Sequence, residues 1–175
     1  MKKVWTMAFA LLVLASVASA QRGPGGPGPG GPGGPEGHAI VGSDGTIYLE
    51  SVTVDTTART SSTKVTAVRT TGTIAWTATV ANARGFVLSG SNLITASETA
   101  ASDGAVSTTL TALSTNSGAV AWTRTLAGRA GDLRPFSGGT YVFVVVPPAT
   151  SGGTATRSLV AIGNDGSVLW TLSLT

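Results

Sequence analysis

Apolar and polar residues alternate in three runs of the chain, and each run contains a tryptophan. In residues 73–80, four apolar side chains take every second position, and threonine or alanine fills the others. The four apolar residues are Ile74, Trp76, Ala78 and Val80. Successive side chains of a strand point to opposite faces, so this alternation predicts a half-buried β-strand. The runs 119–126 and 167–174 repeat the pattern.

Each tryptophan is part of a longer sequence motif, which predicts a strand, a glycine turn and a second strand. Its three copies lie in residues 65–76, 110–122 and 159–170. A glycine stands four residues before the tryptophan in each copy, namely Gly72, Gly118 and Gly166. Glycine adopts the positive φ that tight hairpins require. A repeat period of about 40 to 50 residues is typical of propeller blades and similar arrays of small sheets.

Earlier apolar runs add two strands to each repeat. Tyr48, Ile94 and Val142 each lie in such a run, 28 residues before a tryptophan, and this fixed offset predicts that they occupy equivalent positions. Long polar connections follow these runs and are predicted to be variable loops or extended hairpin tips, at residues 55–62, 100–105 and 147–154. No stretch after residue 20 has a helical period. The prediction is an all-β fold with three four-stranded antiparallel blades of a β-propeller type, an incomplete ring within one chain, over about 38–82, 83–128 and 129–175.

Residues 112–122 resemble the repeat of quinoprotein-dehydrogenase-like propellers, whose pattern is Ala-x-Asp-x-x-Thr-Gly-x-x-x-Trp. The resemblance extends over all three copies. In that family the alanine and the tryptophan pack between adjacent blades, and the glycine turns the chain between the outer strands. The resemblance therefore implies these structural roles for Ala67, Gly72, Trp76, Ala112, Gly118, Trp122, Ala161, Gly166 and Trp170.

The match departs from the family pattern in two respects. The aspartate position holds Arg69, Ser114 and Gly163, and the first and third copies are one residue shorter in the turn. Both departures alter a turn and not the packing, so the resemblance implies a fold more than a function. The dehydrogenase branch of the family uses pyrroloquinoline quinone with calcium in a much larger ring. No counterpart of its vicinal disulfide or calcium-binding acid cluster is found here, and we expect no cofactor.

Three blades are fewer than a closed propeller typically needs, which is four to eight. An open array exposes an apolar sheet face at each end. We expect self-association, and two chains making six blades is the simplest closure. The alternatives are a piece of a longer array and an open stack whose ends are capped by the long loops.

The N-terminal part predicts export. A basic start in residues 1–3, an apolar run at 8–15 and small residues at 18–20 indicate a signal peptide of residues 1–20, cleaved before Gln21. Residues 21–37 are mostly glycine and proline without a strict period of three, which favours a disordered linker over collagen. With no cysteine to carry a lipid anchor, we expect a bacterial periplasmic or secreted protein without a transmembrane segment after signal cleavage.

Charge and chemistry give few functional candidates. Loss of Lys2 and Lys3 with the signal peptide leaves nine basic residues against eight acidic ones, scattered singly, so no nucleic-acid partner is expected. The only histidine is His38, and no cysteine or histidine pair could bind a metal. The Asp-Gly pairs at Asp44, Asp103 and Asp165 are interpreted as turns. Three further carboxylates, Glu50, Glu98 and Asp132, have no spacing that argues for a glycosidase pair.

These observations favour a non-enzymatic module that acts as a protein-interaction or assembly scaffold in the cell envelope. The functional analogue in the resembled family is the scaffold lipoprotein of outer-membrane β-barrel assembly. Arg124, Arg129 and Arg134 lie close together in the sequence and are the candidates for a partner-binding rim. The alternatives are a small-ligand or carbohydrate-binding propeller, with or without an activity, and a fragment of a longer propeller without independent function.

Overall fold

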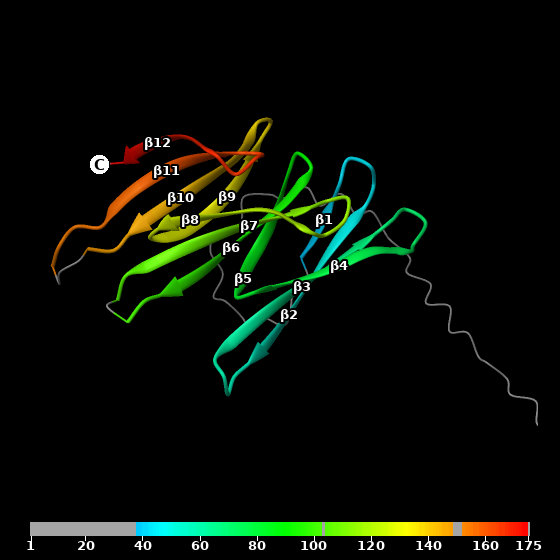
Figure 1. Ribbon diagram of the computed structural model, residues 1–175, viewed down its shortest axis with the longest axis horizontal. Coiled ribbons are helices and arrows are strands. Elements are labelled where there is room, and N and C mark those ends of the chain that lie inside the picture. Colours follow the sequence, from blue (N-terminus) through cyan, green and yellow to red (C-terminus); the bar gives the residue numbers. More distant parts are fainter. Residues whose placement is uncertain (1–37, 103, 149–151, 175) are drawn as a thin grey trace, which may run out of the picture. The chain divides into compact units, whose positions relative to one another are not determined.

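A computed structural model describes residues 38–102, 104–148 and 152–174, so the predicted signal peptide, the predicted linker and Asp103 lie outside the described part. Every regular element in that part is a β-strand, which confirms the all-β prediction. The strands form three four-stranded sheets, and in each sheet the spatial order of the strands is their order in the chain (Figure 1). All neighbouring strands are antiparallel.

The three sheets follow one another along the chain. The first consists of β1 (Ala39–Val41), β2 (Ile47–Asp55), β3 (Thr60–Val68) and β4 (Ile74–Ala81). The second consists of β5 (Ala83–Ser89), β6 (Asn92–Ala100), β7 (Val106–Ser114) and β8 (Val120–Ala127). The third consists of β9 (Arg129–Phe136), β10 (Gly139–Val146), β11 (Thr156–Gly163) and β12 (Val168–Leu174). The connection predicted at residues 55–62 is an extended hairpin tip, because β2 runs to Asp55 and β3 begins at Thr60.

The strand register aligns one row of three side chains across each sheet. Tyr48 pairs with Ala67 and Ala67 with Trp76 in the first sheet. The corresponding rows are Ile94–Ala112–Trp122 in the second sheet and Tyr141–Ala161–Trp170 in the third. The predicted equivalence of Val142 with Tyr48 and Ile94 is therefore wrong by one position. The connection between the second and third strands is longer in the third sheet, and the turn before β12 is not shortened to compensate, so the aligned Tyr141 lies 29 residues before Trp170.

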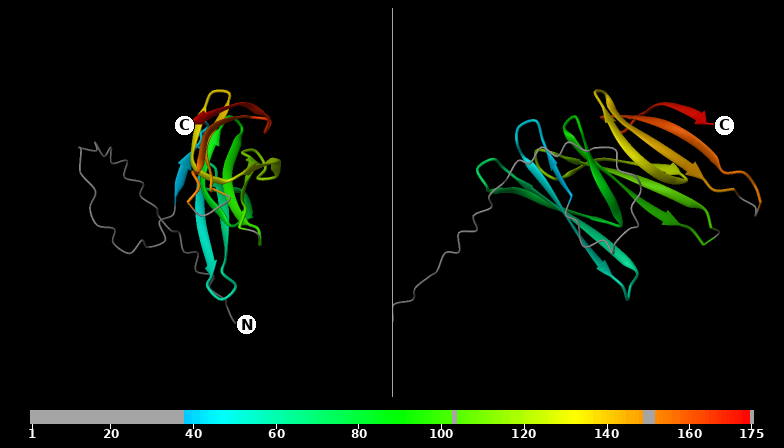
Figure 2. Two further views of the ribbon diagram at one scale, coloured as in Figure 1. Left: turned by 90° about the vertical axis from the view of Figure 1, so that its left-hand side faces the viewer. Right: turned by 180° about the vertical axis from the view of Figure 1, so that it is seen from behind.

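We call the side of each sheet that carries this row its tryptophan face, and the opposite side its receiving face. The tryptophan face of the first sheet packs on the receiving face of the second, in a core cluster of Tyr48, Val65, Ala67, Trp76, Leu93 and Leu113. The second sheet packs on the third in the same way, in a cluster of Ala96, Leu110, Val142, Val144, Val160 and Ile162. Figures 1 and 2 show the three sheets side by side in chain order. The first and second sheets thus each bury their tryptophan face against the sheet that follows.

A threonine hydroxyl fixes each connection between sheets. Thr63 donates from Oγ1 to the carbonyl oxygen of Ala83 at 3.1 Å, where the first sheet passes into the second. Thr108 donates to the carbonyl oxygen of Gly128 at 2.8 Å, where the second passes into the third. Both hydroxyls are buried, and a buried carbonyl needs such a donor. The two connections are therefore built alike.

Candidate functional site

The first junction between sheets is centred on Trp76. Its indole Nε1 donates to the carbonyl oxygen of Thr115 at 2.8 Å, in the β7–β8 turn of the second sheet. The ring lies on Gly118, where a Cβ atom would come within 2.5 Å of Cε3 of Trp76. Gly118 also has a φ of 71°, in the left-handed region that favours glycine. The turn glycine of one sheet thus makes room for the tryptophan of the sheet before it.

The second junction repeats this arrangement one sheet later. Trp122 donates from Nε1 to the carbonyl oxygen of Asn164 at 2.8 Å and lies on Gly166, where a Cβ atom would come within 2.7 Å of the ring. Arg124, two residues along the same strand, donates from Nε to the carbonyl oxygen of Gly166 at 2.8 Å. At both junctions, therefore, a tryptophan of one sheet lies on the turn glycine of the next sheet and donates a hydrogen bond to a carbonyl oxygen of the same turn.

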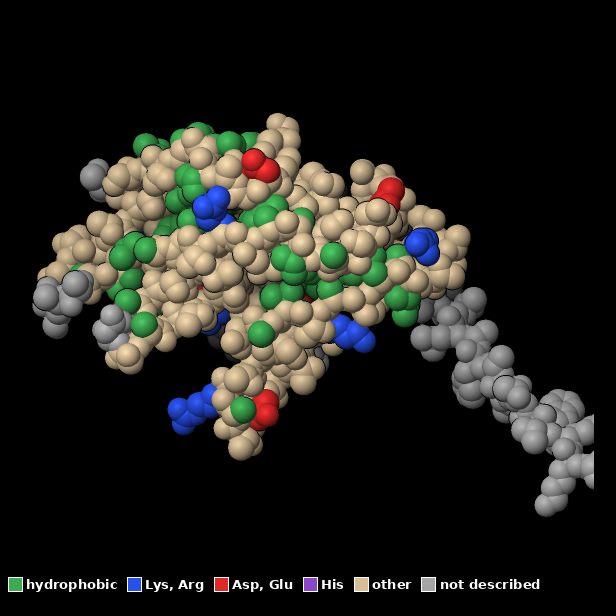
Figure 3. Space-filling view, viewed as in Figure 1, with side chains coloured by type: hydrophobic (Ala, Val, Ile, Leu, Met, Phe, Trp, Pro, Cys, Tyr) green, Lys and Arg blue, Asp and Glu red, His purple; other side chains and the backbone are tan. Residues whose placement is uncertain are grey.

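The third tryptophan has no sheet over it among the described residues. Trp170 is 44% exposed, whereas Trp76 is 9% exposed. Its ring contacts Tyr141 at a centroid distance of 5.6 Å, and Tyr141 stacks on Phe136 at 4.4 Å. The exposed Leu172 lies next to this aromatic row on the same face of β12. Figure 3 shows apolar side chains along the surface where Figure 1 places β12.

The receiving face of the first sheet is open as well. Ile47 is 38% exposed, whereas Leu93, its counterpart in the second sheet, is fully buried under the first sheet. Val41 and Leu49 on the same face are also exposed. At Gly72, the counterpart of Gly118 and Gly166, an added Cβ atom would meet nothing within 4 Å. The described part of the chain therefore presents one uncovered face of each kind.

The arginines of the predicted rim lie in different settings. Arg124 is part of the second junction, through its hydrogen bond to Gly166. Arg134 forms an exposed ion pair with Asp132 at 2.7 Å. Arg129 lies five residues before Arg134 on β9, a span of roughly 16 Å in an extended strand. Their closeness in the sequence does not bring the three side chains into contact.

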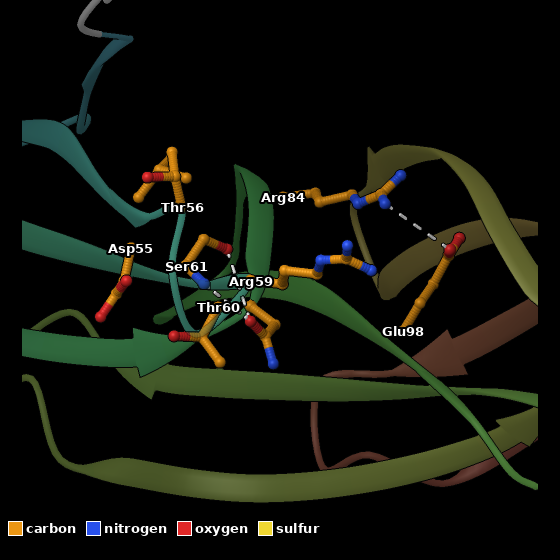
Figure 4. A pocket seen from close by; sticks show the side chains of 9 residues that line it. Asp55, Thr56, Arg59, Thr60, Ser61, Arg84 and Glu98 are labelled. Carbon is orange, nitrogen blue, oxygen red and sulfur yellow. Dashed lines mark hydrogen bonds and ion pairs between the residues drawn. The ribbon is translucent and has the colours of Figure 1, made fainter.

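A polar hollow that the sequence did not indicate lies between the β2–β3 hairpin tip and the start of the second sheet. Its volume is about 520 Å³, and Figure 4 shows the side chains that line it. Arg59, from the hairpin tip, and Arg84, from β5, extend in the same direction toward Glu98. Arg84 pairs with Glu98 at 3.8 Å between Nη2 and Oε2. Two guanidinium groups on one wall give the hollow a cationic side that could bind an anionic or zwitterionic small molecule.

Backbone strain coincides with this hollow. Arg59 and Asn82 have φ values of 53° and 51°, and they are the only residues other than glycine with positive φ in the described part of the chain. Both line the hollow. Asn82 is held there by its side-chain Oδ1, which accepts a hydrogen bond from the backbone N–H of Ser61 at 3.0 Å. Asparagine tolerates positive φ, so the strain lies at Arg59, and strained residues are enriched at functional sites, which makes this hollow the second candidate site.

The remaining titratable candidates lie apart from both sites. Asp44 accepts hydrogen bonds from the backbone and the hydroxyl of Thr46, and Asp165 does the same with Ser167. These bonds lower the pKa of both carboxyl groups and confirm their interpretation as turn residues. Burial raises the pKa of Glu50, against a smaller lowering by His38. Within residues 38–102, 104–148 and 152–174, no three metal-ligating side chains come together.

No protein-family model and no curated protein matches the sequence. The resemblance to the quinoprotein-type repeat therefore stays a prediction from the sequence. In the part of the chain described by the structure, no helix is long and apolar enough to cross a membrane. By its fold the described part of the chain is an all-β protein of three stacked antiparallel sheets that do not close into a ring.

Proposed function

We propose that this chain is an exported, non-enzymatic β-propeller-type module that serves as a protein-interaction or assembly scaffold in the bacterial cell envelope. The observation that carries the proposal is the uncovered tryptophan face of the third sheet. Trp170 and Leu172 are exposed there, beside the aromatic row of Phe136 and Tyr141. Contiguous apolar surface of this kind marks an interaction site, and aromatic residues are enriched in the centre of protein interfaces.

The equivalent faces inside the molecule support the proposal, because both are covered by a further sheet. The natural occupant of such a face is therefore a β-sheet protein surface. The signal peptide and the Gly/Pro-rich linker predicted from the sequence fit an exported module held at the end of a spacer. The proposed location is the periplasm or the outside of the cell.

The test is retention of protein from a cell-envelope extract by the immobilised chain and by two variants. Leu172→Asp places a charge on the exposed tryptophan face and should abolish stoichiometric retention. Thr171→Asp places the same charge on the neighbouring residue, on the other side of the same strand, and should retain protein like the unchanged chain. Equal retention by both variants would show that this face is not the binding surface.

The second candidate function is binding of a small ligand or carbohydrate, and the polar hollow is the site that would bind it. Arg59, Arg84 and Glu98 offer charged hydrogen-bonding groups there, and Arg59 forms no ion pair within the described residues. Retention of the chain on immobilised glycans that is lost in Arg84→Ala and preserved in Leu172→Asp would favour this function. The opposite dependence would exclude the hollow as the glycan site.

A further inference from the structure

The geometry points to a second copy of this chain as the occupant of the tryptophan face. In this arrangement the third sheet of one copy packs on the receiving face of the first sheet of the next copy, and Trp170 lies over Gly72. This inference rests on the proposed function and names the partner and the contact residues. The contact is the same one that already joins the sheets within the chain.

The two uncovered faces are complementary because of the repeat. Each inner junction brings together a tryptophan face and a receiving face, and the described residues leave one face of each kind uncovered. The counterparts of Ile47 and Leu49 in the second sheet are Leu93 and Thr95, and both of these are fully buried under the first sheet. A second copy would bury Ile47 and Leu49 in the same manner.

The turn that would receive Trp170 has the geometry of the turn that already receives Trp122. In residues 163–167, the N–H of Gly163 donates to Ser167 at 2.8 Å, and the N–H of Gly166 donates to Gly163 at 2.9 Å. In residues 69–73, Arg69 donates to Thr73 and Gly72 to Arg69, both at 2.9 Å. The turns are equally long, so the Thr70 carbonyl corresponds to the Asn164 carbonyl that accepts from Trp122. Trp170 Nε1 would therefore donate to the carbonyl oxygen of Thr70.

The space above Gly72 is open, so an indole ring could lie there. A Cβ atom would collide with a tryptophan at Gly118 and at Gly166, but it would meet nothing within 4 Å at Gly72. All three glycines have positive φ, between 71° and 82°. Among the described residues no tryptophan covers Gly72, and of the three described tryptophans Trp170 is the one that lies on no turn.

One difference along the tryptophan face makes the contact between copies more apolar than the second inner junction. Leu172 occupies the position of Arg124, because each lies two residues after the tryptophan of its strand. Arg124 forms a hydrogen bond with the Gly166 carbonyl, whereas leucine contributes apolar area only. Exposed Ile47, Leu49 and Val41 on the receiving face supply matching apolar surface.

This contact is head-to-tail, since two different faces meet. Head-to-tail contacts form closed rings when the rotation between copies closes and open filaments when it does not. Two copies provide six sheets, a number within the range of closed propellers. Either form requires the same pairing of Trp170 with Gly72.

The experiment measures the native mass of the purified chain and of three variants over a concentration series. The unchanged chain should have a mass of two or more chains. Trp170→Ala removes the indole, and Gly72→Asn fills the space above the turn with a residue that tolerates positive φ. Each should have the mass of a single chain. Gly104→Asn is the matched control, because Gly104 has a φ of 85° and open space around its Cβ position but lies in the β6–β7 tip; it should assemble like the unchanged chain.

Mixing the two assembly-deficient variants tests the direction of the contact. The Gly72→Asn chain keeps an intact tryptophan face, and the Trp170→Ala chain keeps an intact receiving face. An equimolar mixture should therefore form a species of two chains, one of each variant, although neither variant assembles alone. A mixture that stays monomeric would overturn the head-to-tail contact.

Other outcomes separate this inference from the proposed function. A monomeric unchanged chain at every concentration overturns the second copy as partner. If that chain still retains a different envelope protein in stoichiometric amount, and Leu172→Asp loses it, the proposed interaction function stands without self-assembly. If Trp170→Ala fails to fold, the Gly72→Asn variant and its Gly104→Asn control still decide the question, since both substitutions leave the core intact.

Discussion

Trp76 and Trp170 occupy the same position of their sheets but have different surroundings. Trp76 lies between two sheets, on Gly118, with its Nε1 bonded to the Thr115 carbonyl. Trp170 lies on an uncovered face, with Tyr141 beside it and no backbone acceptor for its Nε1 among the described residues. The tryptophan of the same sequence motif is therefore a core residue where a further sheet follows and a surface residue where none is described. The difference shows that a repeat specifies interfaces as well as sheets.

The largest effect is expected at the covered position. Trp76→Ala should lower the free energy of unfolding by about 3–5 kcal/mol, because it removes the central side chain of the first core cluster. Urea unfolding followed by circular dichroism measures this value. A loss below about 1 kcal/mol would mean that the junction between the first two sheets contributes little to stability.

A pair of glycine substitutions compares the two kinds of turn directly. Gly72→Ala and Gly118→Ala both force alanine into positive φ, which costs roughly 1–2 kcal/mol. At Gly118 the new Cβ atom would also displace the Trp76 ring, so this variant should lose clearly more stability than Gly72→Ala. Unfolding of both variants under dilute conditions gives the difference, and equal losses would show that the ring moves aside without cost.

The next largest loss of stability is expected when the threonine hydroxyls at the connections between sheets are removed. Thr108→Val leaves both the Gly128 carbonyl and the N–H of Ala130 without their partner, and should cost about 1–3 kcal/mol. Thr63→Val removes one hydrogen bond, to Ala83, and should cost less. Hydrogen exchange at Ala130 provides a local measurement. Identical losses in the two variants would contradict this ranking.

Trp170→Ala is the counterpart of Trp76→Ala on the uncovered face. In a single copy it should cost roughly 1 kcal/mol or less, because half of the ring's environment is solvent. At concentrations at which copies associate, the cost should grow, since the substitution then also removes the contact between copies. Unfolding midpoints measured over a range of chain concentrations test this dependence, and an effect that does not change with concentration would argue against the self-contact.

Part of this arrangement could be predicted from the sequence and part could not. Alternation and the glycine–tryptophan spacing predict the hairpins, since these are local properties of a few residues. The equivalence of Val142 failed because strand register depends on the length of each connection, which a fixed offset ignores. The hollow at Arg59 and Arg84 depends on how far the β2–β3 tip extends beside the next sheet, and that extension is a property of packing between sheets.

The smallest expected effect is a change in the pKa of a carboxyl group in one of two turns. Hydrogen bonds from Thr46 lower the pKa of Asp44, and hydrogen bonds from Ser167 lower that of Asp165, with a smaller contribution from the Arg124 cation. A carboxyl group with a lowered pKa stabilises the folded state above its ordinary pKa, and this contribution is lost as the pH falls through the folded-state value.

Arg124→Ala should therefore raise the pKa of Asp165 and leave that of Asp44 unchanged, because Arg124 reaches only the turn of the second junction. Carboxyl carbon NMR titration resolves the two groups. Added salt should act in the same direction on Asp165 alone, since it screens the arginine charge and not the hydrogen bonds. Equal shifts of both groups would mean that the variant disturbs the folded sheets in general and that Arg124 does not act at the junction where Trp122 meets Gly166.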